Sequence, residues 1–574
     1  MAIRVRFFCV LLMLFLAAGC GPGKGGPVSN LYFAALTQAT PGQLSSQGQS
    51  ALLAMIDEGR LPDLQCSNFA DYRIPARGFY ESAGGKVVWL RDGQPSQQAQ
   101  QLITLLQNAD KKGLNPGDYD GPKWASRVEA LQAQKSESDQ LRFDLALTIS
   151  AMRYASDLHM GRVDPHQLGL GYDVNSKKID LAEFLKRNVV DASDVAAAFL
   201  QLEPAFPDYQ RTEQALEVYE KLAQDDDASA GPFPVTKSPL KAGDPYPETE
   251  RLTRFLQGLG DLPPDATIPD KSRVYKGDVV EGIKHFQESH GLPATGRIDE
   301  DTFRRLNRQL NTPLATRVNQ LQLALERWRW LPFGTPQPLI VVNVPEFQLR
   351  AFDEEYNPVL TMRVLVGKAQ TNETPLFASR MKSVVFRPYW NVPASIERAE
   401  LLPAIERDGG YIANHSFEVV DSRSRVVSGG ANVVSGLRSG QLSIRQRPGA
   451  RNALGLVKFD FPNQYDVYMH DTPAVRLFSR ARRDLTHGCI RVQEAEDLAE
   501  WVLRFNTQWS RDAIHSAMEG SKTVPVSLVH PFSVFIVYMT TIVLENGEIR
   551  FFNDIYGQDE ALRQALARRE ACSA

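Results

Sequence analysis

The chain has 574 residues and a formal net charge of −4, with 43% hydrophobic and 23% charged residues. This length is too great for one small domain and predicts about three domains, and the composition is typical of a folded protein. The sequence lacks the basic surplus or basic run of a nucleic-acid-binding protein, so we expect no nucleic-acid partner.

The N-terminus has the pattern of a secretory signal peptide, which we predict at residues 1–19. Arg4 and Arg6 precede an apolar run from Phe7 to Leu16, and small residues follow directly before Cys20. The apolar run is shorter than the roughly 18–20 residues of a membrane-spanning helix. We therefore expect export of the chain rather than a transmembrane segment.

A cysteine after small residues resembles a bacterial lipobox, and the resemblance implies that Cys20 is lipidated. Gly21 rather than aspartate follows it, which favours the outer membrane. We therefore expect a periplasmic lipoprotein, anchored to the outer membrane through Cys20. The alternative is an ordinary cleaved signal with an incidental cysteine.

Two stretches follow the signal. Residues 20–50 are rich in Gly, Ser, Gln and Pro, which predicts a flexible tether. Residues 51–245 show helical periodicity, as in the helix that carries Leu102 and Leu106 and stops at Gly113. We predict a helical scaffold domain here, ending in a linker rich in Pro, Gly and Asp, with no catalytic cluster.

Residues 246–312 predict a small helical module. Asp278 can cap one helix and Asp299 a second, and the sequence GLPATG forms the turn between them. These residues resemble the peptidoglycan-binding module of three short helices. The resemblance implies that residues 275–307 bind cell-wall glycan.

From about residue 338 the hydrophobic period changes to two, which predicts strands. The predicted strands are 339–352, 360–368, a hairpin at 456–471 that turns at Pro462-Asn463, 523–529 and 532–544. An excursion at 397–448 is too long for a simple loop and predicts a lid-like insertion. The predicted fold is therefore multidomain α+β, with a helical scaffold, a three-helix module, a β-rich domain at 325–545 and a C-terminal tail at 546–574.

The stretch LTHGCIRV, residues 485–492, contains one of only five cysteines in the chain. Alternation directs Ile490 and Val492 to the core, so His487, Cys489 and Arg491 share the opposite face. A helix follows, and a nearby cation and a helix N-terminus both favour a thiolate. We therefore predict that Cys489 is a nucleophile.

A cysteine nucleophile needs a base. His470 lies nineteen positions earlier, on the polar face of its strand, where it can meet Cys489 across adjacent strands or a short crossover. His487 is two residues from Cys489 on one strand, about 6–7 Å away. We predict that His470 is the base and that His487 positions other groups, while Thr486 and Gly488 leave room for the backbone to approach a substrate.

His470 followed by Thr486-His487-Gly488-Cys489-Ile490-Arg491 resembles the signature of the L,D-transpeptidase family, over roughly residues 325–545. The order of scaffold, peptidoglycan-binding module and lid-bearing catalytic domain resembles the long periplasmic members. The resemblance implies an acyl-accepting Cys489, a base His470 oriented by the backbone carbonyl of Asp471, and an oxyanion hole from the amides of Gly488 and Cys489.

The resemblance also implies the reaction. Cys489 attacks the amide after the third residue of a tetrapeptide stem and expels D-alanine, and the amine of a second stem resolves the thioester to a 3→3 cross-link. The partners are thus a donor tetrapeptide and an acceptor stem, with no cofactor. We predict substrate contacts from Arg491, His487, Tyr468 and Thr486. For Arg491 the alternative is a surface arginine paired with an acidic residue of the following helix.

Three other interpretations stay open. His470, His487 and Cys489 could ligate zinc, although this spacing is unusual and neither HExxH nor CxxC occurs; we predict no metal. The protein could be a non-catalytic lipoprotein that tethers membrane to wall. Water could also resolve the thioester, which would make the protein an L,D-carboxypeptidase or endopeptidase.

Overall fold

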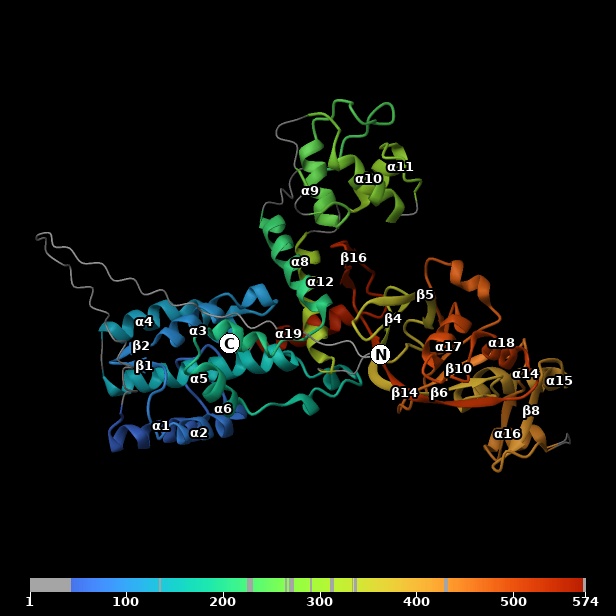
Figure 1. Cartoon of the computed structure of the whole chain (residues 1–574), viewed down its shortest axis with the longest axis horizontal. Helices are drawn as coiled ribbons and strands as arrows, with labels where there is room; N and C mark the ends of the chain where they lie inside the picture. Colours follow the sequence, from blue (N-terminus) through green and yellow to red (C-terminus); the bar gives the residue numbers. More distant parts are fainter. Residues whose placement is uncertain are drawn as a thin grey trace, which may run out of the picture. The chain divides into compact units, whose positions relative to one another are not determined.

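The structure is a computed structural model, and it describes residues 43–570 except for short stretches at 134–135, 225–230, 264–265, 268–272, 290–291, 310–313, 333, 335–337 and 428–431. The predicted signal peptide and Cys20 lie outside the described residues. Among the residues described, no helix combines the length and the apolar character needed to cross a membrane. The described chain is a multidomain α+β protein, as the sequence predicts (Figure 1).

The N-terminal helices share one hydrophobic core, whose buried residues run from Leu44 to Leu202. Its first helix is α1 (Ser46–Glu58), where the Ser45 hydroxyl caps the helix by accepting a hydrogen bond from the Gly48 N–H. The other elements are α2 (Arg73–Ser82), β1 (Leu90–Arg91), β2 (Gln94–Pro95), α3 (Gln97–Gln107), α4 (Trp124–Ala133), α5 (Glu137–Met160), α6 (Leu181–Phe184) and α7 (Val195–Leu200). The predicted tether at 20–50 is therefore too long, because its last residues belong to α1.

Helix α8 (Pro207–Gln224) lies outside this helical core, although the sequence placed it in the scaffold. It packs on α12 (Leu314–Trp330). Its buried Leu216 belongs, with Leu325, to the hydrophobic cluster that also contains the strands of the β-rich domain. The predicted scaffold boundary at 245 is therefore wrong, because the apolar face of α8 is buried against a helix that follows it by about a hundred positions.

The predicted module has a core of its own, formed by α9 (Thr249–Leu259), α10 (Asp278–Ser289) and α11 (Glu300–Gln309). The core also includes Phe233 and Leu240 from the stretch predicted as a linker. Leu240 exchanges backbone hydrogen bonds of 3.0 Å with Ile298. The module therefore begins before residue 246.

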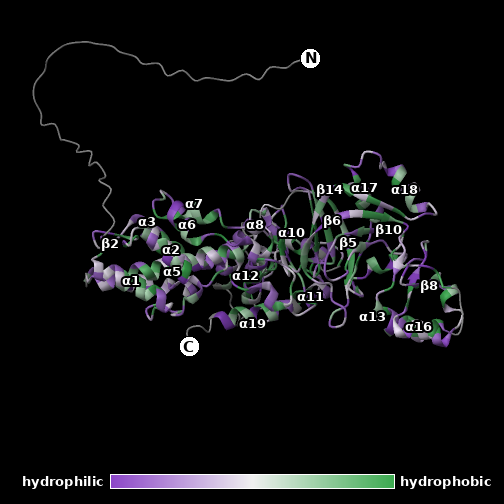
Figure 2. Cartoon of the chain, turned by 90° about the horizontal axis from the view of Figure 1, so that it is seen from below, coloured by the Kyte–Doolittle hydropathy of each residue, from purple (hydrophilic) through white to green (hydrophobic). Residues whose placement is uncertain are grey.

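The β-rich domain is a sheet that closes on itself. Its strand order is β12-β5-β13-β11-β10-β6-β14-β3-β4, and β4 pairs back with β5. The strands are β3 (Leu339–Asn343), β4 (Gln348–Phe352), β5 (Pro358–Gly367), β6 (Phe377–Phe386), β10 (Val457–Asp460), β11 (Met469–His470), β12 (Asp484–Thr486), β13 (Ile490–Val492) and β14 (Val524–Val537). Hydrophobic residues follow these strands, green in Figure 2 near β6, β10 and β14, and fill the interior. Helices α17 (Ala495–Leu503) and α18 (Arg511–Glu519) follow β13.

Two strand predictions differ from this sheet. The segments 523–529 and 532–544 contribute to one long strand, β14, whose register against β6 shifts between Ser527 and Phe532. A bulge there replaces the expected break. The β10–β11 hairpin closes through residues 461–468 rather than a tight turn, because the Asn463 amide donates to the carbonyls of Phe461 and Val467 at 2.8 and 2.7 Å.

The excursion between the strands is a small subdomain, which we call the lid and define as residues 390–446. Its sheet has the order β7-β9-β8. The elements are β7 (Trp390–Asn391), α13 (Ala394–Ile396), a π-helical turn (Glu397–Leu401), α14 (Leu402–Arg407), α15 (Tyr411–Asn414), β8 (Phe417–Asp421), α16 (Val433–Ser439) and β9 (Leu442–Gln446). Ile405, Leu437 and Ile444 belong to its own hydrophobic core. The lid thus begins a few residues before the predicted insertion.

The predicted C-terminal tail at 546–574 is wrong for most of its length. Strand β16 (Ile549–Phe551) pairs with β15 (Thr541–Val543), and helix α19 (Gln558–Glu570) follows. Leu562 and Leu566 of α19 are buried in the same cluster as the strands of the closed sheet. These two apolar residues lie one turn apart and pack the helix on its neighbours.

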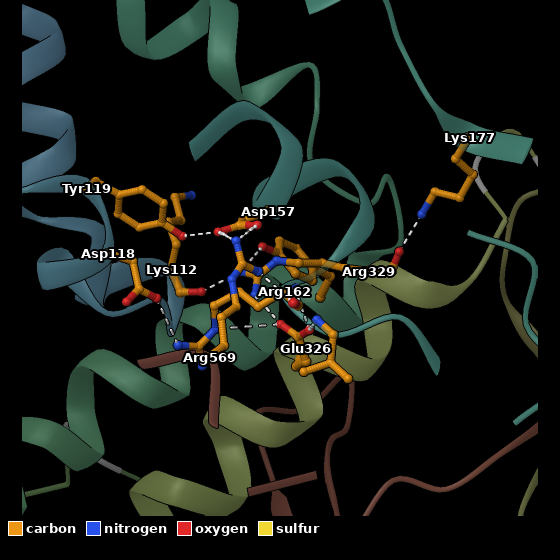
Figure 3. A network of polar contacts seen from close by, with 11 residues as sticks. Lys112, Asp118, Tyr119, Asp157, Arg162, Lys177, Glu326, Arg329 and Arg569 are labelled. Carbon is orange, nitrogen blue, oxygen red and sulfur yellow. Dashed lines mark hydrogen bonds and ion pairs between the residues drawn. The ribbon is translucent and has the colours of Figure 1, made fainter. Parts of the chain in front are cut away.

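Helix α19 also joins a network of buried charges (Figure 3). Arg569 donates to both carboxylate oxygens of Asp157 in α5, at 2.8 and 2.9 Å, and the Tyr119 hydroxyl donates to the same carboxylate at 2.8 Å. Beside it, Glu326 of α12 accepts a hydrogen bond from the Arg162 N–H at 2.5 Å. The network connects the helical core, α12 and the C-terminal segment.

Candidate active site

The site is built on two neighbouring strands of the closed sheet. β11 runs parallel to β13, with Met469 opposite Ile490 and His470 opposite Arg491. The Ile490 N–H donates to the Tyr468 carbonyl at 3.1 Å, which places Tyr468 opposite Cys489. Ile490 and Val492 are fully buried, as alternation predicts. The expectation that the strands of His470 and Cys489 are adjacent is confirmed by this pairing.

His470 is held by the residue that follows it. Its Nδ1 lies 2.5 Å from the Asp471 carbonyl oxygen. Because a carbonyl can only accept, Nδ1 carries the proton and Nε2 is the unprotonated nitrogen. Burial lowers the pKa of His470 to about 3, with the positive charge of Arg491 as the next cause. The imidazole is therefore neutral near pH 7 and can accept a proton.

Asp471 is in turn fixed by the turn before β10. Its N–H donates to the Val457 carbonyl at 3.0 Å, and its Oδ2 accepts from the Leu456 N–H at 2.9 Å. A Cβ at Gly455, whose φ is +62°, would lie 2.3 Å from that oxygen, so only glycine fits there. These contacts set the carbonyl that orients His470.

The thiol of Cys489 is partly buried. Burial raises the pKa of its thiol above the usual 9.0, against the lowering effects of Tyr468, Lys458 and Arg491. The thiol can donate weakly to the Asp466 carbonyl, 4.0 Å away. Burial therefore opposes the thiolate that the nearby cation favours. Helix α17 starts only at Ala495, after strand β13, and the favourable effect of a helix end is confined to its first turn.

Lys458 and Tyr468 complete the face around the sulfur. The Lys458 Nζ lies 4.2 Å from the centroid of the Tyr468 ring and 3.2 Å from Asp460. Burial and the adjacent Cys489 raise the pKa of Tyr468, so its hydroxyl stays protonated. We predicted Tyr468 but not Lys458. The signal was present, because alternation through the hairpin puts Lys458 on the same polar face as Tyr468 and His470.

Arg491 lies on the same face and is mostly buried. Its Nε is buried without a hydrogen-bond partner, and burial lowers the pKa of the guanidinium. Within the described residues Arg491 forms no ion pair, and Glu496 faces His515 instead at 3.4 Å. The alternative of a surface arginine paired with the following helix is therefore wrong. The site keeps an uncompensated cation beside the nucleophile.

The same residues match a known catalytic domain. Residues 337–526 match the family profile of the L,D-transpeptidase catalytic domain. This part of the chain is similar to L,D-transpeptidase catalytic domains. Residues 246–306 match a peptidoglycan binding domain, and residues 75–216 match a scaffold domain.

Two known proteins are similar to the chain. A protein of Haemophilus influenzae that bears the name L,D-transpeptidase is 32% identical over 227 residues, which are 39% of this chain and 45% of that protein. The chain thus spans about half the length of this relative. The crystal structure of an L,D-transpeptidase from Xylanimonas cellulosilytica is 14% identical, with a TM-score of 0.14, and the match covers 53% of this chain and 100% of that one.

In the matched domain, His487 points to the lid. Its Nε2 lies 2.6 Å from Glu400 Oε1 in the lid, and both side chains are about half exposed. His470 and His487 therefore have different partners. Among the residues described, no three His, Cys, Asp or Glu side chains are grouped to hold a metal ion.

Thr486 and Gly488 shape the loop around Cys489. The Thr486 hydroxyl donates to the Cys489 carbonyl at 2.6 Å and accepts from the Gly488 N–H at 3.2 Å. Gly488 has a φ of +115°, which favours glycine. Thr486 is buried, so its hydroxyl serves the loop, and a substrate contact from it stays a prediction.

Proposed function

We propose that the chain is a peptidoglycan L,D-transpeptidase that forms 3→3 cross-links through a thioester on Cys489. One observation carries the proposal: a neutral His470, with its proton fixed on Nδ1 by the Asp471 carbonyl, lies on the strand next to Cys489. An imidazole that is unprotonated on Nε2 can take the thiol proton as the sulfur attacks. The resting pair is then a neutral thiol and a neutral imidazole.

The reaction has an acylation step and a transfer step. The Cys489 S–H proton passes to His470 Nε2 while the sulfur bonds to the carbonyl carbon of the stem amide. The tetrahedral intermediate collapses, the C–N bond breaks, and the imidazolium returns its proton to the departing D-alanine amine. The acceptor amine then attacks the thioester and gives its proton to His470, the C–S bond breaks, and the leaving Cys489 thiolate takes that proton back from the imidazolium.

Arg491 supplies a charge for this reaction. Its unpartnered Nε and its place on the face of Cys489 suit it to pair with a stem carboxylate, for which a guanidinium is well shaped. Tyr468 and Lys458 also favour the thiolate as it forms. We assign these three residues to substrate binding and to stabilisation of the nucleophile.

The proposal extends to the other parts of the chain. The three-helix module would hold the enzyme on wall glycan, and Cys20 would carry a lipid that anchors it to the outer membrane in the periplasm. The sequence pattern before Cys20 supports the lipid. A Cys20→Ala chain should lose the acyl mass and leave the membrane fraction, and a native chain that is soluble and unacylated would contradict this.

The reaction is tested with a purified disaccharide-tetrapeptide. Wild type should form an adduct on Cys489, release D-alanine and yield 3→3 dimers, all detected by mass spectrometry, whereas Cys489→Ala should do none of these. His470→Gln should slow adduct formation by roughly a hundredfold or more. Cys66→Ser is the matched control, since Cys66 lies in the helical region, and it should react like wild type.

The same assay separates the alternatives. D-Alanine release without dimers, even at high acceptor concentration, would indicate the carboxypeptidase. Cleavage of existing cross-links would indicate the endopeptidase. If a folded chain forms no adduct on Cys489, the result would favour the non-catalytic lipoprotein that tethers membrane to wall.

A further inference from the structure

The peptide unit between Gly488 and Cys489 is held from one side by a residue outside the predicted site. The hydroxyl of Thr374, in the loop between β5 and β6, donates to the Gly488 carbonyl at 2.8 Å. A trans peptide is planar, so its N–H points opposite to its C=O. The Thr374 contact therefore sets the direction in which the Cys489 N–H points.

The neighbouring peptide units are also fixed. The Cys489 carbonyl accepts from Thr486, and the Ile490 N–H donates to the Tyr468 carbonyl. The Cys489 N–H has no acceptor among the residues that the structure describes. A fixed and unpaired donor beside the nucleophile is the geometry that stabilises a developing oxyanion.

Thr374 has no freedom to turn away. It is 1% exposed, and its hydroxyl oxygen accepts from the Gly367 N–H at 2.8 Å. Its single proton is thus directed to Gly488. A Cβ at Gly367 would lie 2.0 Å from the Asn372 carbonyl, so the loop is closely packed on the end of β5.

Tyr556 holds this loop from the C-terminal segment. Its hydroxyl donates to the Gly367 carbonyl at 2.5 Å and accepts from the Thr374 N–H at 3.3 Å. Its backbone N–H donates to the Tyr538 hydroxyl at 2.7 Å, and that hydroxyl donates to Asp554 at 2.6 Å. Tyr556 lies thirty positions beyond the matched catalytic domain, which ends at residue 526.

We propose that Thr374, held by Tyr556, is a positioning residue that aims the Cys489 amide at the oxyanion of the tetrahedral intermediate. The inference rests on the proposed function, because it assumes acyl transfer at Cys489. It adds that the C-terminal segment is required for catalysis and not only for stability. It also predicts that variants of Thr374 and Tyr556 slow the acylation of Cys489 more than they slow other reactions of the thiol.

Two reactions of the same sulfur test the idea. Acylation by the disaccharide-tetrapeptide or by a carbapenem-type β-lactam passes through an oxyanion, whereas alkylation by iodoacetamide does not. Thr374→Val keeps the shape of the side chain but loses the hydroxyl, whereas Thr374→Ser keeps the hydroxyl. Tyr556→Phe removes only the hydroxyl that holds the loop of Thr374. Thr371→Val, at an exposed threonine of the same loop, is the matched control.

We expect Thr374→Val to slow acylation of Cys489 by roughly tenfold to a hundredfold, since one lost oxyanion donor costs about 10²–10³ in rate. Tyr556→Phe should slow it less, by about threefold to tenfold. In both variants the alkylation rate should stay within about twofold of wild type, with KM nearly unchanged. Thr374→Ser should recover most of the acylation rate.

Parallel loss of acylation and alkylation would reduce Thr374 to a structural role and overturn the inference. Unchanged acylation in Thr374→Val and Tyr556→Phe would overturn it as well. If Thr374→Val does not fold, the acylation rate of Tyr556→Phe tests the inference instead, because this substitution leaves the packing of the loop in place. A wild-type chain that is alkylated but never acylated would instead refute the proposed function, so the two failures are distinguishable.

Discussion

Arg569→Ala is expected to loosen helix α19 from the helical core. The Arg569 guanidinium bonds both oxygens of Asp157, whose side chain is 2% exposed, and it also donates to the Arg162 carbonyl at 2.6 Å (Figure 3). Without Arg569 the Asp157 carboxylate stays buried with fewer partners. The substitution keeps a good helix former in α19, so its effect comes from the lost contacts.

The size of the effect follows from burial. Removing one partner of a fully buried ion pair costs about 3–5 kcal/mol. The Arg569 side chain is 31% exposed, and the Tyr119 hydroxyl still donates to Asp157, so we expect a smaller cost of about 2–3 kcal/mol. At 1.36 kcal/mol per factor of ten, local opening of α19 becomes about 30- to 160-fold more frequent.

Amide hydrogen exchange of the full chain, followed by mass spectrometry, measures this opening directly. Peptides from α19 should exchange faster by about that factor in Arg569→Ala, and Asp157→Asn should have a similar effect. Arg568→Ala is the matched control, because Arg568 is exposed on the same helix. Exchange within about twofold of wild type in Arg569→Ala, or an equal effect of Arg568→Ala, would refute the reasoning.

Three further predictions concern pH and the lid. The rate of alkylation of Cys489, followed by site-resolved mass spectrometry, should rise about tenfold per pH unit between pH 6 and 8. The reason is that burial holds the thiol pKa above 9.0, while His470, with a pKa of about 3, is already neutral. A plateau of the rate above pH 7 would contradict this. Asp261, and then Glu548, raise the pKa of His285, so its contact with the β15–β16 hairpin should be present below pH 6.5 and be lost as pH rises through the raised pKa. After correction for the intrinsic pH dependence of amide exchange, α10 should be less protected at pH 8 than at pH 5.5 in wild type, and a difference that persists in His285→Gln would argue against this origin. Leu437→Ala, at a buried position of the lid core, should destabilise the lid by about 2–5 kcal/mol and speed its proteolysis. Val426→Ala, at an exposed position, should have neither effect. Equal cleavage of both variants would rule out a contribution of the buried Leu437 side chain to the stability of the lid.

Local patterns predicted the parts of the site that lie on regular strands. Strict alternation through β13 and through the two strands of the hairpin placed Ile490, Val492 and His470 on the correct faces, because one face of each strand is buried. The lid was also recognisable, since a stretch of fifty residues between strands must bury its own apolar side chains. These predictions needed only the sequence within one element.

Other parts depend on residues far apart in the chain. The raised pKa of the Cys489 thiol follows from burial by several elements, which the adjacent Arg491 and the following helix did not reveal. In the sequence, the apolar residues of α19 that mark a buried face are Leu562 and Leu566, and this pattern is too short to distinguish a packed helix from a C-terminal tail. Thr374 and Tyr556 reach the catalytic loop through contacts separated by more than a hundred positions, and no local period encodes such a contact.

The contact between Tyr556 and the loop of Thr374 has a consequence for biosynthesis. The segment that carries Tyr556 follows every strand of the closed sheet in the chain, so the ribosome makes it after the sheet and the cysteine motif. A chain whose synthesis stops before residue 556 would carry every strand of the closed sheet and the cysteine motif, but its catalytic loop would lack the support of Tyr556.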